Sequence, residues 1–445
     1  MRVPKYKGVV DSLAAQIRGG RWPGGHRLPT HRRLAADKGI AVVTASRVYA
    51  ELEAMGLVSS EQGRGTFVRD LAAATGDEID QRTVAADAID LSFNSPSVPG
   101  QAELLRQALR DLAAAGDLDA LLRYQPPRGR VQDRAAVAHH LRRRGLDVGR
   151  DRVLIVNGAQ HGLAVTAMAL FQPGDVVAVD AVTYPGFIVL ARTLGLELSP
   201  LPVTGAGPDL DAFEQLCRRR RVRAVFAMPT LHNPLGWVLD DSQRARLVWI
   251  AHRYGVSIIE DASYAYLVED APPPLAMLAP DLTVYVSGLS KSVAPGLRIG
   301  FIAAPAALVS ALERGIRATT WHTPGLTAAI AGRWLNEGTV DRLETQKRDD
   351  ARRRQSIAME LLAGLPCVRH PSSYFLWLPL AQDARPDRIA AALADRRVAV
   401  STAEPFATTT TVPHALRLAL GSVGIPELRD ALHAVREEAE RDPFR

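Results

Sequence analysis

The sequence predicts an α/β protein in which a small, mainly helical N-terminal unit precedes a large body with a mainly parallel sheet and helices on both faces. The first observation is the charge, because residues 1–70 carry 12 basic and 6 acidic side chains and the rest of the chain carries 42 of each. The second is the alternation of short apolar runs with amphipathic stretches from about residue 91, which is typical of βαβ units. The third is a change near residue 310, after which helical patterns dominate and short apolar runs predict a small C-terminal α+β subdomain.

The N-terminal unit, residues 1–70, shows three helical patterns and then a hairpin. Val9, Leu13 and Ile17 recur at helical spacing and predict a helix over 5–18, which two glycines end. The other expected elements are a short helix over 31–38 between Thr30 and Gly39, a third helix with Val48, Leu52 and Met55 on one side, and a hairpin from 57–59 and 66–68 around Gly63-Arg64-Gly65. This order is the outline of a winged helix-turn-helix, and its positive charge favours a polyanionic partner.

The body is expected over 91–445, after a linker over 71–90 that is rich in Ala and Asp. Strands of its main sheet are expected at Val153–Val156, Val176–Asp180, Ala224–Met228, Ser257–Glu260 and Thr283–Val286, and short strands of the C-terminal subdomain near Tyr374–Leu378 and Ala415–Leu420. Amphipathic segments lie between these runs, so the main sheet should be mostly parallel.

Composition excludes several classes of protein. With 47% hydrophobic and 23% charged residues, the chain has the composition of a globular protein. No apolar run approaches the ~18 residues of a membrane span, and the N-terminus lacks the apolar core of a signal peptide, so we expect a cytoplasmic protein with no membrane partner. Two cysteines, Cys217 and Cys367, cannot form a disulfide framework or a four-ligand zinc site. Neither His-Glu-x-x-His nor Cys-x-x-Cys occurs, and no metal site is predicted.

Three motifs of the N-terminal unit carry a family resemblance. They read Arg27-Leu-Pro-Thr-His-Arg-Arg-Leu-Ala-Ala, Thr44-Ala-Ser-Arg-Val-Tyr-Ala-Glu-Leu-Glu-Ala-Met-Gly-Leu-Val and Gln62-Gly-Arg-Gly-Thr-Phe-Val. The whole unit resembles the GntR family of transcription regulators. The resemblance implies a double-stranded DNA operator, with the third helix in the major groove and the second helix and the wing on the backbone. The DNA contacts that it implies are Arg32, Thr44, Ser46, Arg47 and Arg64.

The third helix departs from the family at its start. The family usually begins this helix with Ser/Thr-Arg-x-Thr, whereas this chain reads Ala41-Val42-Val43-Thr44. A side-chain cap and an arginine that could read guanine are both missing. A winged helix that binds only protein is the alternative interpretation of this unit.

The body carries the residue types that pyridoxal phosphate requires, namely a lysine for a Schiff base, a carboxylate for the pyridine nitrogen and an anion site for the phosphate. Lysine is scarce, and Lys291 follows an apolar run, with Arg298 seven residues later. Asp261 ends another run and would aim its carboxylate into a crevice at the carboxyl edge of the sheet. Asn233 lies in a turn after a predicted strand. Gly158–Gln160 joins a strand to a helix whose backbone N–H groups can receive phosphate.

In this order and placement, these residues make the chain resemble fold-type I aminotransferases, the PLP-dependent transferase fold type I, over roughly 90–440. On that resemblance Lys291 forms the Schiff base. The resemblance places Asp261 at the pyridinium, Asn233 and Tyr264 at the ring hydroxyl, Tyr184 on the ring, Gly158, Ala159, Gln160 and Arg298 at the phosphate, and Tyr124 of the partner subunit at the same phosphate. Arg417 matches the arginine that grips a substrate carboxylate. Where the family often has Ser or Thr, three residues before the lysine, this chain has Gly288, and Ser287 and Ser290 are candidate substitutes.

A GntR-type winged helix fused to an aminotransferase-like body resembles the MocR subfamily of regulators. The resemblance implies a homodimer that binds pyridoxal phosphate at Lys291 as an internal aldimine. It also implies an effector, which is pyridoxal phosphate itself, an amino acid or an ω-amino acid, that shifts the dimer and repositions the DNA-binding units. Two further hypotheses stay open. One is an active aminotransferase with a DNA-binding unit, in which Lys291 is also the catalytic proton shuttle, and the other is a regulator that does not use the cofactor.

Overall fold

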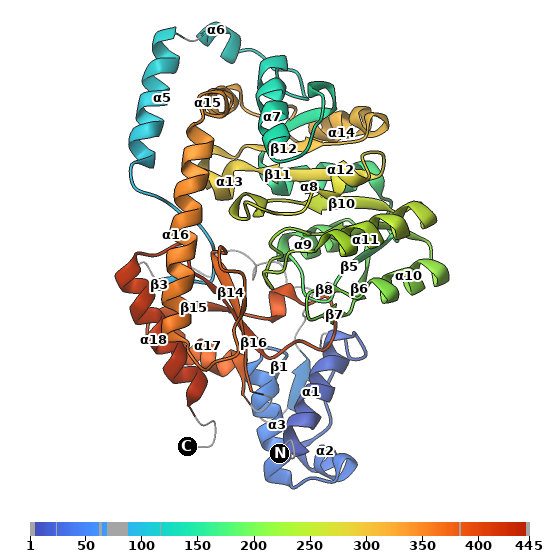
Figure 1. Ribbon diagram of the computed structural model, residues 1–445. Helices are drawn as coiled ribbons and strands as arrows, with labels where there is room; N and C mark the ends of the chain where they lie inside the picture. Colours follow the sequence, from blue (N-terminus) through green and yellow to red (C-terminus); the bar gives the residue numbers. More distant parts are fainter. Residues whose placement is uncertain are drawn as a thin grey trace.

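The structure, a computed structural model, describes residues 5–23, 25–61, 65–68, 88–115, 117–381 and 384–441. Figure 1 shows a small N-terminal head, which we define as the described part of residues 5–68, at one end of a large body. The predicted linker lies outside the described residues up to residue 87. Its last residues, Ile89 and Asp90, are already in a strand of the body.

The head contains the helices and the hairpin that the sequence predicts. Helices α1 (Lys5–Arg18), α2 (His31–Lys38) and α3 (Val42–Ala54) precede an antiparallel hairpin of β1 (Val58–Glu61) and β2 (Gly65–Val68). Thr30 caps α2 by accepting a hydrogen bond from Arg33 N, and Gly39 ends it in the left-handed conformation, as predicted. The start of α3 has no side-chain cap, also as predicted. The apolar sides of the three helices meet in a core of their own.

The body contains a seven-stranded sheet with the order β4-β12-β11-β10-β9-β5-β6. Neighbouring strands are parallel except at β12, which is antiparallel to both of its neighbours. The strands are β4 (Val153–Val156), β5 (Val176–Asp180), β6 (Glu197–Leu201), β9 (Val222–Ala227), β10 (Ser257–Asp261), β11 (Thr283–Gly288) and β12 (Gly300–Ala303). The five strands that the sequence predicts are confirmed within two residues at each end. The pattern does not predict β6, whose edge position leaves it polar and partly exposed, or the short β12.

Helices cover both faces of this sheet, as the sequence predicts. Alternate residues of β4 show the two sides, because Leu154 and Val156 pack with α8, α9 and α14, whereas Val153 and Ile155 pack with α7. Helices α10, α11 and α12 extend the second layer. The bounds are α7 (Val131–Arg143), α8 (Gly158–Leu170), α9 (Pro185–Thr193), α10 (Leu210–Arg219), α11 (Asp241–Tyr254), α12 (Leu275–Leu278) and α14 (Ala306–Thr319). Because helices cover both faces, successive side chains of each strand are buried, and this explains why the strand sequences are continuous apolar runs.

The small C-terminal subdomain has a five-stranded sheet with the order β13-β14-β16-β15-β3. Strand β3 (Ile89–Leu91) comes from the start of the body and runs parallel to β15 (Val398–Thr402). The other strands are β13 (Val368–Arg369), β14 (Phe375–Pro379) and β16 (Ala415–Ala419), and the helices are α16 (Thr339–Leu361), α17 (Pro386–Asp395) and α18 (Ile425–Glu440). The predicted α+β subdomain is confirmed, and its pairing with β3 joins segments that local sequence patterns cannot connect.

Several short elements complete the described chain. They are α5 (Gln101–Ala115), α6 (Leu118–Leu121), α13 (Leu289–Ser292), α15 (Gly325–Asn336), β7 (Val203–Thr204), β8 (Gly207–Pro208) and short 3₁₀ helices at 150–152, 265–267, 295–297 and 404–406. Within the described ranges, no helix is both long and apolar enough to cross a membrane.

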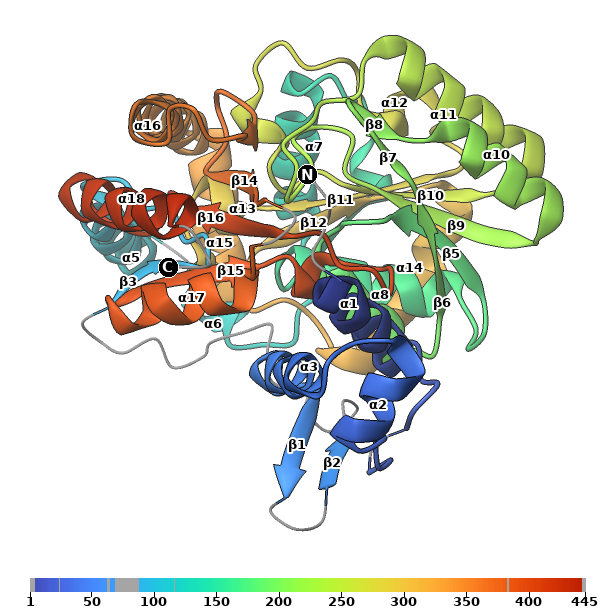
Figure 2. The ribbon, with the colours of Figure 1, turned by 90° about the horizontal axis from the view of Figure 1, so that it is seen from below.

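The head lies against the C-terminal subdomain, as Figure 1 and Figure 2 both show. Glu51 of α3 is fully buried there. Its carboxylate meets Arg385 just before α17 (Nε to Oε2, 3.1 Å) and Arg388 within α17 (Nη2 to Oε1, 2.7 Å). The third helix of the head is therefore tied to the body through a buried ion pair.

Candidate cofactor site and DNA-facing surface

Lys291 lies where β11 passes directly into the short helix α13. Its Nζ donates a hydrogen bond to the backbone carbonyl of Asn94 (2.5 Å) and lies 4.5 Å from the centre of the Phe93 ring. Both partners belong to the segment that follows β3, so distant parts of the chain meet at this amine. The sequence points to Lys291 but not to Asn94 or Phe93, because neither lies in a motif that signals the contact.

Asp261 is the last residue of β10, as predicted, and its side chain is almost completely buried. It pairs in register with Val286 of β11, so the carboxylate and Lys291 lie at the same edge of the sheet. Burial raises the pKa of the Asp261 carboxyl, and hydrogen bonds from the backbone and hydroxyl of Ser263 (2.9 and 2.6 Å) oppose this shift. Among the described residues no cation pairs with this carboxylate. A ligand that presents a protonated nitrogen would stabilise its ionised form.

Asn233 follows β9 in a loop that a buried arginine fixes. Arg244 of α11 is fully buried and donates hydrogen bonds to the carbonyls of Leu239 (2.9 Å), Pro229 (2.9 Å) and Pro273 (3.1 Å). These bonds join both ends of the loop to one guanidinium. Asn233 is buried, and its Oδ1 has no hydrogen-bond partner among the described residues. Arg244 is a supporting residue that the sequence motifs do not indicate.

Tyr264 and Arg417 meet beside the ring of Phe375. The rings of Tyr264 and Phe375 are 5.0 Å apart in an edge-to-face arrangement, and the Arg417 guanidinium lies 5.2 Å from the centre of the Phe375 ring. Arg417 is 4% exposed, and burial lowers its pKa while a hydrogen bond with Tyr264 opposes the shift. Its Nη1 donates to the carbonyl of Ser92 (3.2 Å), and no carboxylate of the described chain forms an ion pair with it. A buried guanidinium that has no ion-pair partner favours an anionic ligand.

The predicted phosphate-binding residues come together at the N-terminus of α8. Gly158 begins this helix, and a side chain there would meet Arg298, because a Cβ atom would lie 2.7 Å from Arg298 Nη2. Arg298 also donates a hydrogen bond to the carbonyl of Asn157 (3.1 Å). Gln160 donates to the carbonyl of Gly186 (2.8 Å). Backbone N–H groups, a helix dipole and a guanidinium thus converge where an anion can bind.

Tyr184 lies next to this group, as expected for a residue that flanks the cofactor ring. It precedes α9, and a Cβ atom on Gly186 would lie 2.5 Å from the Tyr184 ring and 2.6 Å from Gln160 Oε1. Glycine at 186 therefore lets Tyr184 and Gln160 approach each other.

The departure at Gly288 has a steric cause. A Cβ atom at this position would lie 2.9 Å from the carbonyl oxygen of Ile299 and 3.1 Å from Gly300 Cα, so β12 leaves no room for Ser or Thr. Of the two candidate substitutes, Ser287 donates its hydroxyl to the carbonyl of Ala262 (3.1 Å). Ser290 Oγ is buried and has no partner among the described residues. Ser290 is therefore the hydroxyl that stays available for a ligand.

Buried polar atoms without a hydrogen-bond partner gather at this edge of the sheet. In the described chain they include Asn157 Oδ1, Gln160 Oε1, Asn233 Oδ1, Ser290 Oγ, Asn94 Nδ2 and, from the neighbouring subdomain, Arg417 Nε. Buried polar groups are normally paired, so an unpaired set marks the place of a ligand. Together with a lysine amine, a buried carboxylate and an anion site, this set fits pyridoxal phosphate.

Lys347 of α16 is a second lysine at the site, and the sequence signals it only through the scarcity of lysine. It is fully buried, and its Nζ donates to the carbonyls of Pro96 (2.9 Å), Lys291 (3.0 Å) and Val293 (2.6 Å). Burial and the charge of Lys291 lower the pKa of Lys347 to about 7. Lys347 thus holds the Lys291 turn against the segment after β3.

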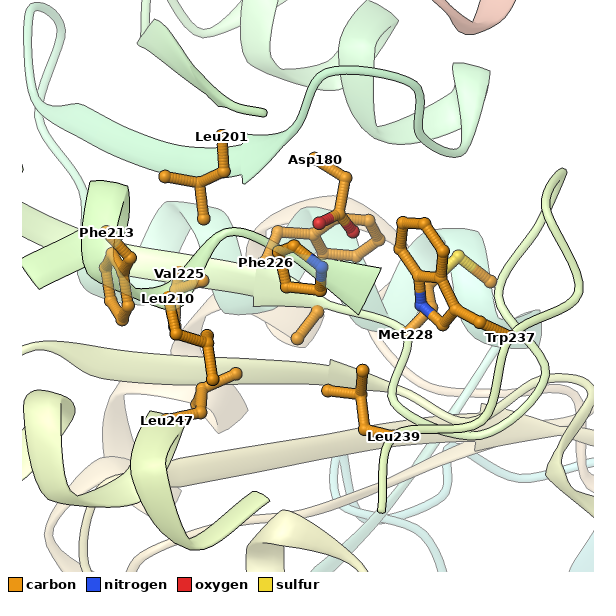
Figure 3. A pocket seen from close by; sticks show the side chains of 12 residues that line it. Asp180, Leu201, Leu210, Phe213, Val225, Phe226, Met228, Trp237, Leu239 and Leu247 are labelled. Carbon is orange, nitrogen blue, oxygen red and sulfur yellow. The ribbon is translucent and has the colours of Figure 1, made fainter. Parts of the chain in front are cut away.

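A small pocket lies beside the site, between β5, β9, α10 and α11 (Figure 3). It is lined mainly by apolar side chains such as Phe226 and Leu247, with Asp180 on one side. Its space of ≈ 10 Å³ is at the lower limit for one water molecule, so it cannot hold a cofactor. Asp180 connects it to the site, because its Oδ2 lies 3.1 Å from Nε2 of His232, the neighbour of Asn233.

Tyr124 is 83% exposed, so it lies on the surface and is not buried in the cofactor site of its own chain. Its ring lies 5.9 Å from that of Trp321 and 6.0 Å from that of His322. The three rings form an exposed aromatic cluster near α6.

The structure describes four of the five predicted DNA contacts. Arg32 at the start of α2 is exposed, and Thr44 is half-buried. The Ser46 hydroxyl lies 2.9 Å from Nδ1 of His31, and the exposed Arg47 lies over the ring of Tyr6 at 4.4 Å. Arg64 in the wing lies outside the described residues.

Comparison with known proteins adds to these observations. The family model "Aminotransferase class I and II" matches residues 86–435, and the model "Bacterial regulatory proteins, gntR family" matches residues 5–68. The probable rhizopine catabolism regulatory protein MocR of Rhizobium meliloti is 27% identical over 86% of this chain and 80% of its own length. The 2-aminoadipate transaminase of Thermus thermophilus is 28% identical over 70% of this chain and 79% of its own length.

Among solved structures, the body is similar to LysN, the α-aminoadipate aminotransferase of Thermus thermophilus, in a complex with N-(5'-phosphopyridoxyl)-L-leucine. The TM-score is 0.74 at 24% identity, and the match covers 83% of this chain and 98% of LysN. This likeness shows a shared fold.

Proposed function

The chain belongs to the aminotransferase class I and II family and is a GntR-type transcription regulator of the MocR kind, and from this premise we propose that it senses pyridoxal phosphate or an amino compound at Lys291. The family implies pyridoxal phosphate as the cofactor. The observation that carries the proposal is the set of unpaired buried polar atoms around the Lys291 edge of the sheet. A ligand that pairs with these atoms stabilises one arrangement of the body, and DNA affinity then changes by the same coupling free energy.

Each residue of the site has one task in this proposal. The bound cofactor supplies an aldehyde for covalent attachment and a ring that withdraws electrons. Lys291 offers the amine, and Asp261 holds a proton on the ring nitrogen. The remaining contacts are Asn233 and Tyr264 to the ring hydroxyl, Tyr184 to the ring face, and Arg298, Ser290, Gln160 and the N–H groups of Gly158 and Ala159 to the phosphate.

Arg417 favours an effector with a carboxylate. Its guanidinium is buried, and in the described chain no carboxylate forms an ion pair with it, although the charge of Asp90 acts on it from a distance. It shares the segment after β3 with Lys291, because it bonds Ser92 while Lys291 bonds Asn94. An amino acid or an ω-amino acid can present an amine to Lys291 and a carboxylate to Arg417, and this geometry supports such an effector.

Segment 403–414 provides a route from the site to the head. At one end it bonds the chain just before Tyr184, because Thr183 N donates to the carbonyl of Phe406 (2.8 Å) and Thr408 N donates to that of Ala181 (3.0 Å). Thr408 Oγ1 also donates to the carbonyl of Asp180 (3.0 Å). The segment is thus attached to residues that flank the cofactor ring and support the Asn233 loop.

The same segment contacts the first helix of the head. Arg18 at the end of α1 pairs with Glu404 at 2.6 Å, and Lys7 Nζ lies 3.1 Å from His414 Nδ1. A shift of the Tyr184 side can therefore move α1. This physical connection supports the proposal that occupancy of the site changes the position of the head.

A homodimer is part of the proposal. Exposed apolar side chains cluster around α6 and the start of α15, and Gly325 packs against Leu121 there. The cluster consists of Leu118, Leu122, Tyr124, Trp321 and Leu326. Exposed apolar side chains in neighbouring elements favour association, which would bury Tyr124 and bring it to the phosphate of the partner subunit.

The same family membership supports two further proposals, a DNA operator as the partner and the cytoplasm as the location. We infer that Arg32, Thr44, Ser46, Arg47 and Arg64 contact double-stranded DNA. The excess of positive charge in residues 1–70 supports DNA as the partner. A DNA partner in turn supports a cytoplasmic location.

The test compares the full-length chain with Lys291→Ala. After addition of pyridoxal phosphate, the wild type is expected to develop the visible absorbance of a covalently bound cofactor, and the variant is not. DNA affinity is then measured with and without the cofactor and a panel of amino acids and ω-amino acids. Retention of the absorbance in Lys291→Ala, or DNA affinity that no ligand changes in the wild type, would contradict the proposal.

An active aminotransferase with a DNA-binding head is the second candidate function. The lysine and the carboxylate that transamination needs lie at one edge of the main sheet, Arg417 of β16 meets Tyr264 beside them, and a transaminase is among the relatives. Steady-state release of keto acid from an amino acid would support this function. Ligand-dependent DNA binding without release of keto acid favours the regulator alone.

A further inference from the structure

The start of α3 exposes two valines side by side. Val42 is 47% exposed and Val43 is 82% exposed, and in the described part of the head they are the only large apolar side chains with such exposure. Other apolar residues of α3, such as Val48 and Leu52, are fully buried. Exposed apolar area is costly in water, so two adjacent valines indicate a contact surface rather than a part of the core.

These valines begin an exposed stretch of α3. Arg47 and Ala50, four and seven residues after Val43, are also exposed on the face that begins at Val43. Glu51 lies about two turns after Val43, near the C-terminal end of the helix, where it is buried against Arg385. The C-terminal subdomain thus contacts α3 near its C-terminal end and leaves the valines at its start open to a partner.

Charge identifies the partner of this face. The exposed Arg32 and Arg33 stand at the start of α2, which packs against α3, and residues 1–70 carry twice as many basic as acidic side chains. An apolar protein partner would not need this charge, whereas the phosphates that border a DNA groove do. The face therefore suits the major groove, in which a helix meets base edges between two phosphate backbones.

We propose that Val42 and Val43 contact the C5-methyl groups of thymines and so select T·A pairs in the operator. Valine has no hydrogen-bonding group, and the thymine methyl is the apolar group that base edges present in the major groove. Ala41, which precedes the two valines, also has no hydroxyl group that could bond to a base edge. The proposal rests on DNA binding by the head and adds the base that this helix reads.

The experiment removes single methyl groups from the DNA. The full-length chain with pyridoxal phosphate selects duplexes from a random pool, and each thymine of the selected sequence is then replaced by uracil. Replacement at a contacted position is expected to lower the affinity of the wild type about fourfold per methyl group. In the double variant Val42→Ala, Val43→Ala the same replacement should change the affinity less than twofold.

Two further variants sharpen the test. Val203→Ala, which shortens an exposed valine of the body, should keep the full sensitivity to uracil. Val42→Arg should shift the selected base toward guanine, because arginine pairs with guanine O6 and N7. Wild-type binding that is indifferent to uracil at every thymine, or a double variant as sensitive as the wild type, would overturn the valine assignment. Failure to select any duplex would instead contradict DNA binding itself.

Discussion

Among the residues of the site, Lys347 shows how burial sets chemistry. Its ammonium group has three carbonyl acceptors and, within the described chain, no ion-pair partner. Burial and the charge of Lys291 lower the pKa of Lys347 and dominate, while the negative charges of Asp350 and Glu344 oppose this shift. The scarcity of lysine made both residues visible in the sequence, but only Lys291 follows an apolar run that ends at the site. The role of Lys347 depends on contacts across the fold.

Replacement of Lys347 should change how stability depends on pH. The folded pKa is about 7 and the unfolded value is about 10.4, so between these pH values the unfolded chain binds more protons. The free energy of unfolding of the wild type should therefore rise with pH in this window, by up to about 1.4 kcal/mol per pH unit. Lys347→Met should lack this contribution, which urea unfolding at pH 7, 8 and 9 can measure.

Lys38→Met is the matched control, because Lys38 is exposed at the end of α2 and should leave the slope unchanged. Parallel pH curves for the wild type and Lys347→Met would show that the buried lysine keeps an ordinary pKa.

At the scale of elements, helices and strands with strong local signals were predictable, and short or edge elements were not. Helix α1 has the predicted bounds, and α2 has the predicted cap and stop. Strand β12 has four residues and depends on its neighbours β4 and β11 for its place in the sheet. The steric need for Gly288 arises from this strand, so the sequence could show the departure without its cause.

The second helix should hold the DNA backbone. Arg32→Ala is expected to weaken binding to all duplexes to a similar degree and to reduce the slope of log affinity against log salt by about one, because one phosphate contact is lost. Fluorescence anisotropy over a range of salt concentrations measures both effects. Arg429→Ala, which removes a half-buried arginine of α18 in the body, should change neither. An unaltered salt slope in Arg32→Ala would exclude Arg32 as a phosphate contact.

For the whole molecule, the decisive feature is the attachment of the head to the C-terminal subdomain. Glu51 is an ordinary acidic residue in the pattern of α3, and Arg385 lies far away in the sequence. Only the fold makes them a buried pair, and it adds Arg388 to the same carboxylate. The segment 403–414 makes a second attachment through Glu404.

Arg385→Met should uncouple the two parts without harm to the cofactor site. Loss of the arginine leaves Glu51 buried with only the exposed Arg388 as partner, at a cost of roughly 3 kcal/mol to the docked head. The visible absorbance with pyridoxal phosphate should persist, while the ligand-dependent change in DNA affinity should fall to less than half. Spectroscopic titration and anisotropy measure these two properties in the same samples.

Arg396→Met is the control at the other end of α17, where Arg396 pairs with Glu437 at 2.8 Å and does not face the head. Full ligand response in Arg385→Met would show that the buried pair does not transmit the signal.

The sequence by itself determined the main elements and the family resemblance of the two parts, and it predicted a set of candidate cofactor residues, because these depend on local periodicity, charge and motifs of a few residues. Tertiary structure decided what surrounds those residues. Asn94 at the Lys291 amine, Arg244 behind Asn233, Lys347 under the Lys291 turn and Arg385 against Glu51 are contacts between segments far apart in the chain. Such contacts form only when the sheet edges and the subdomain come together, and no local pattern encodes them.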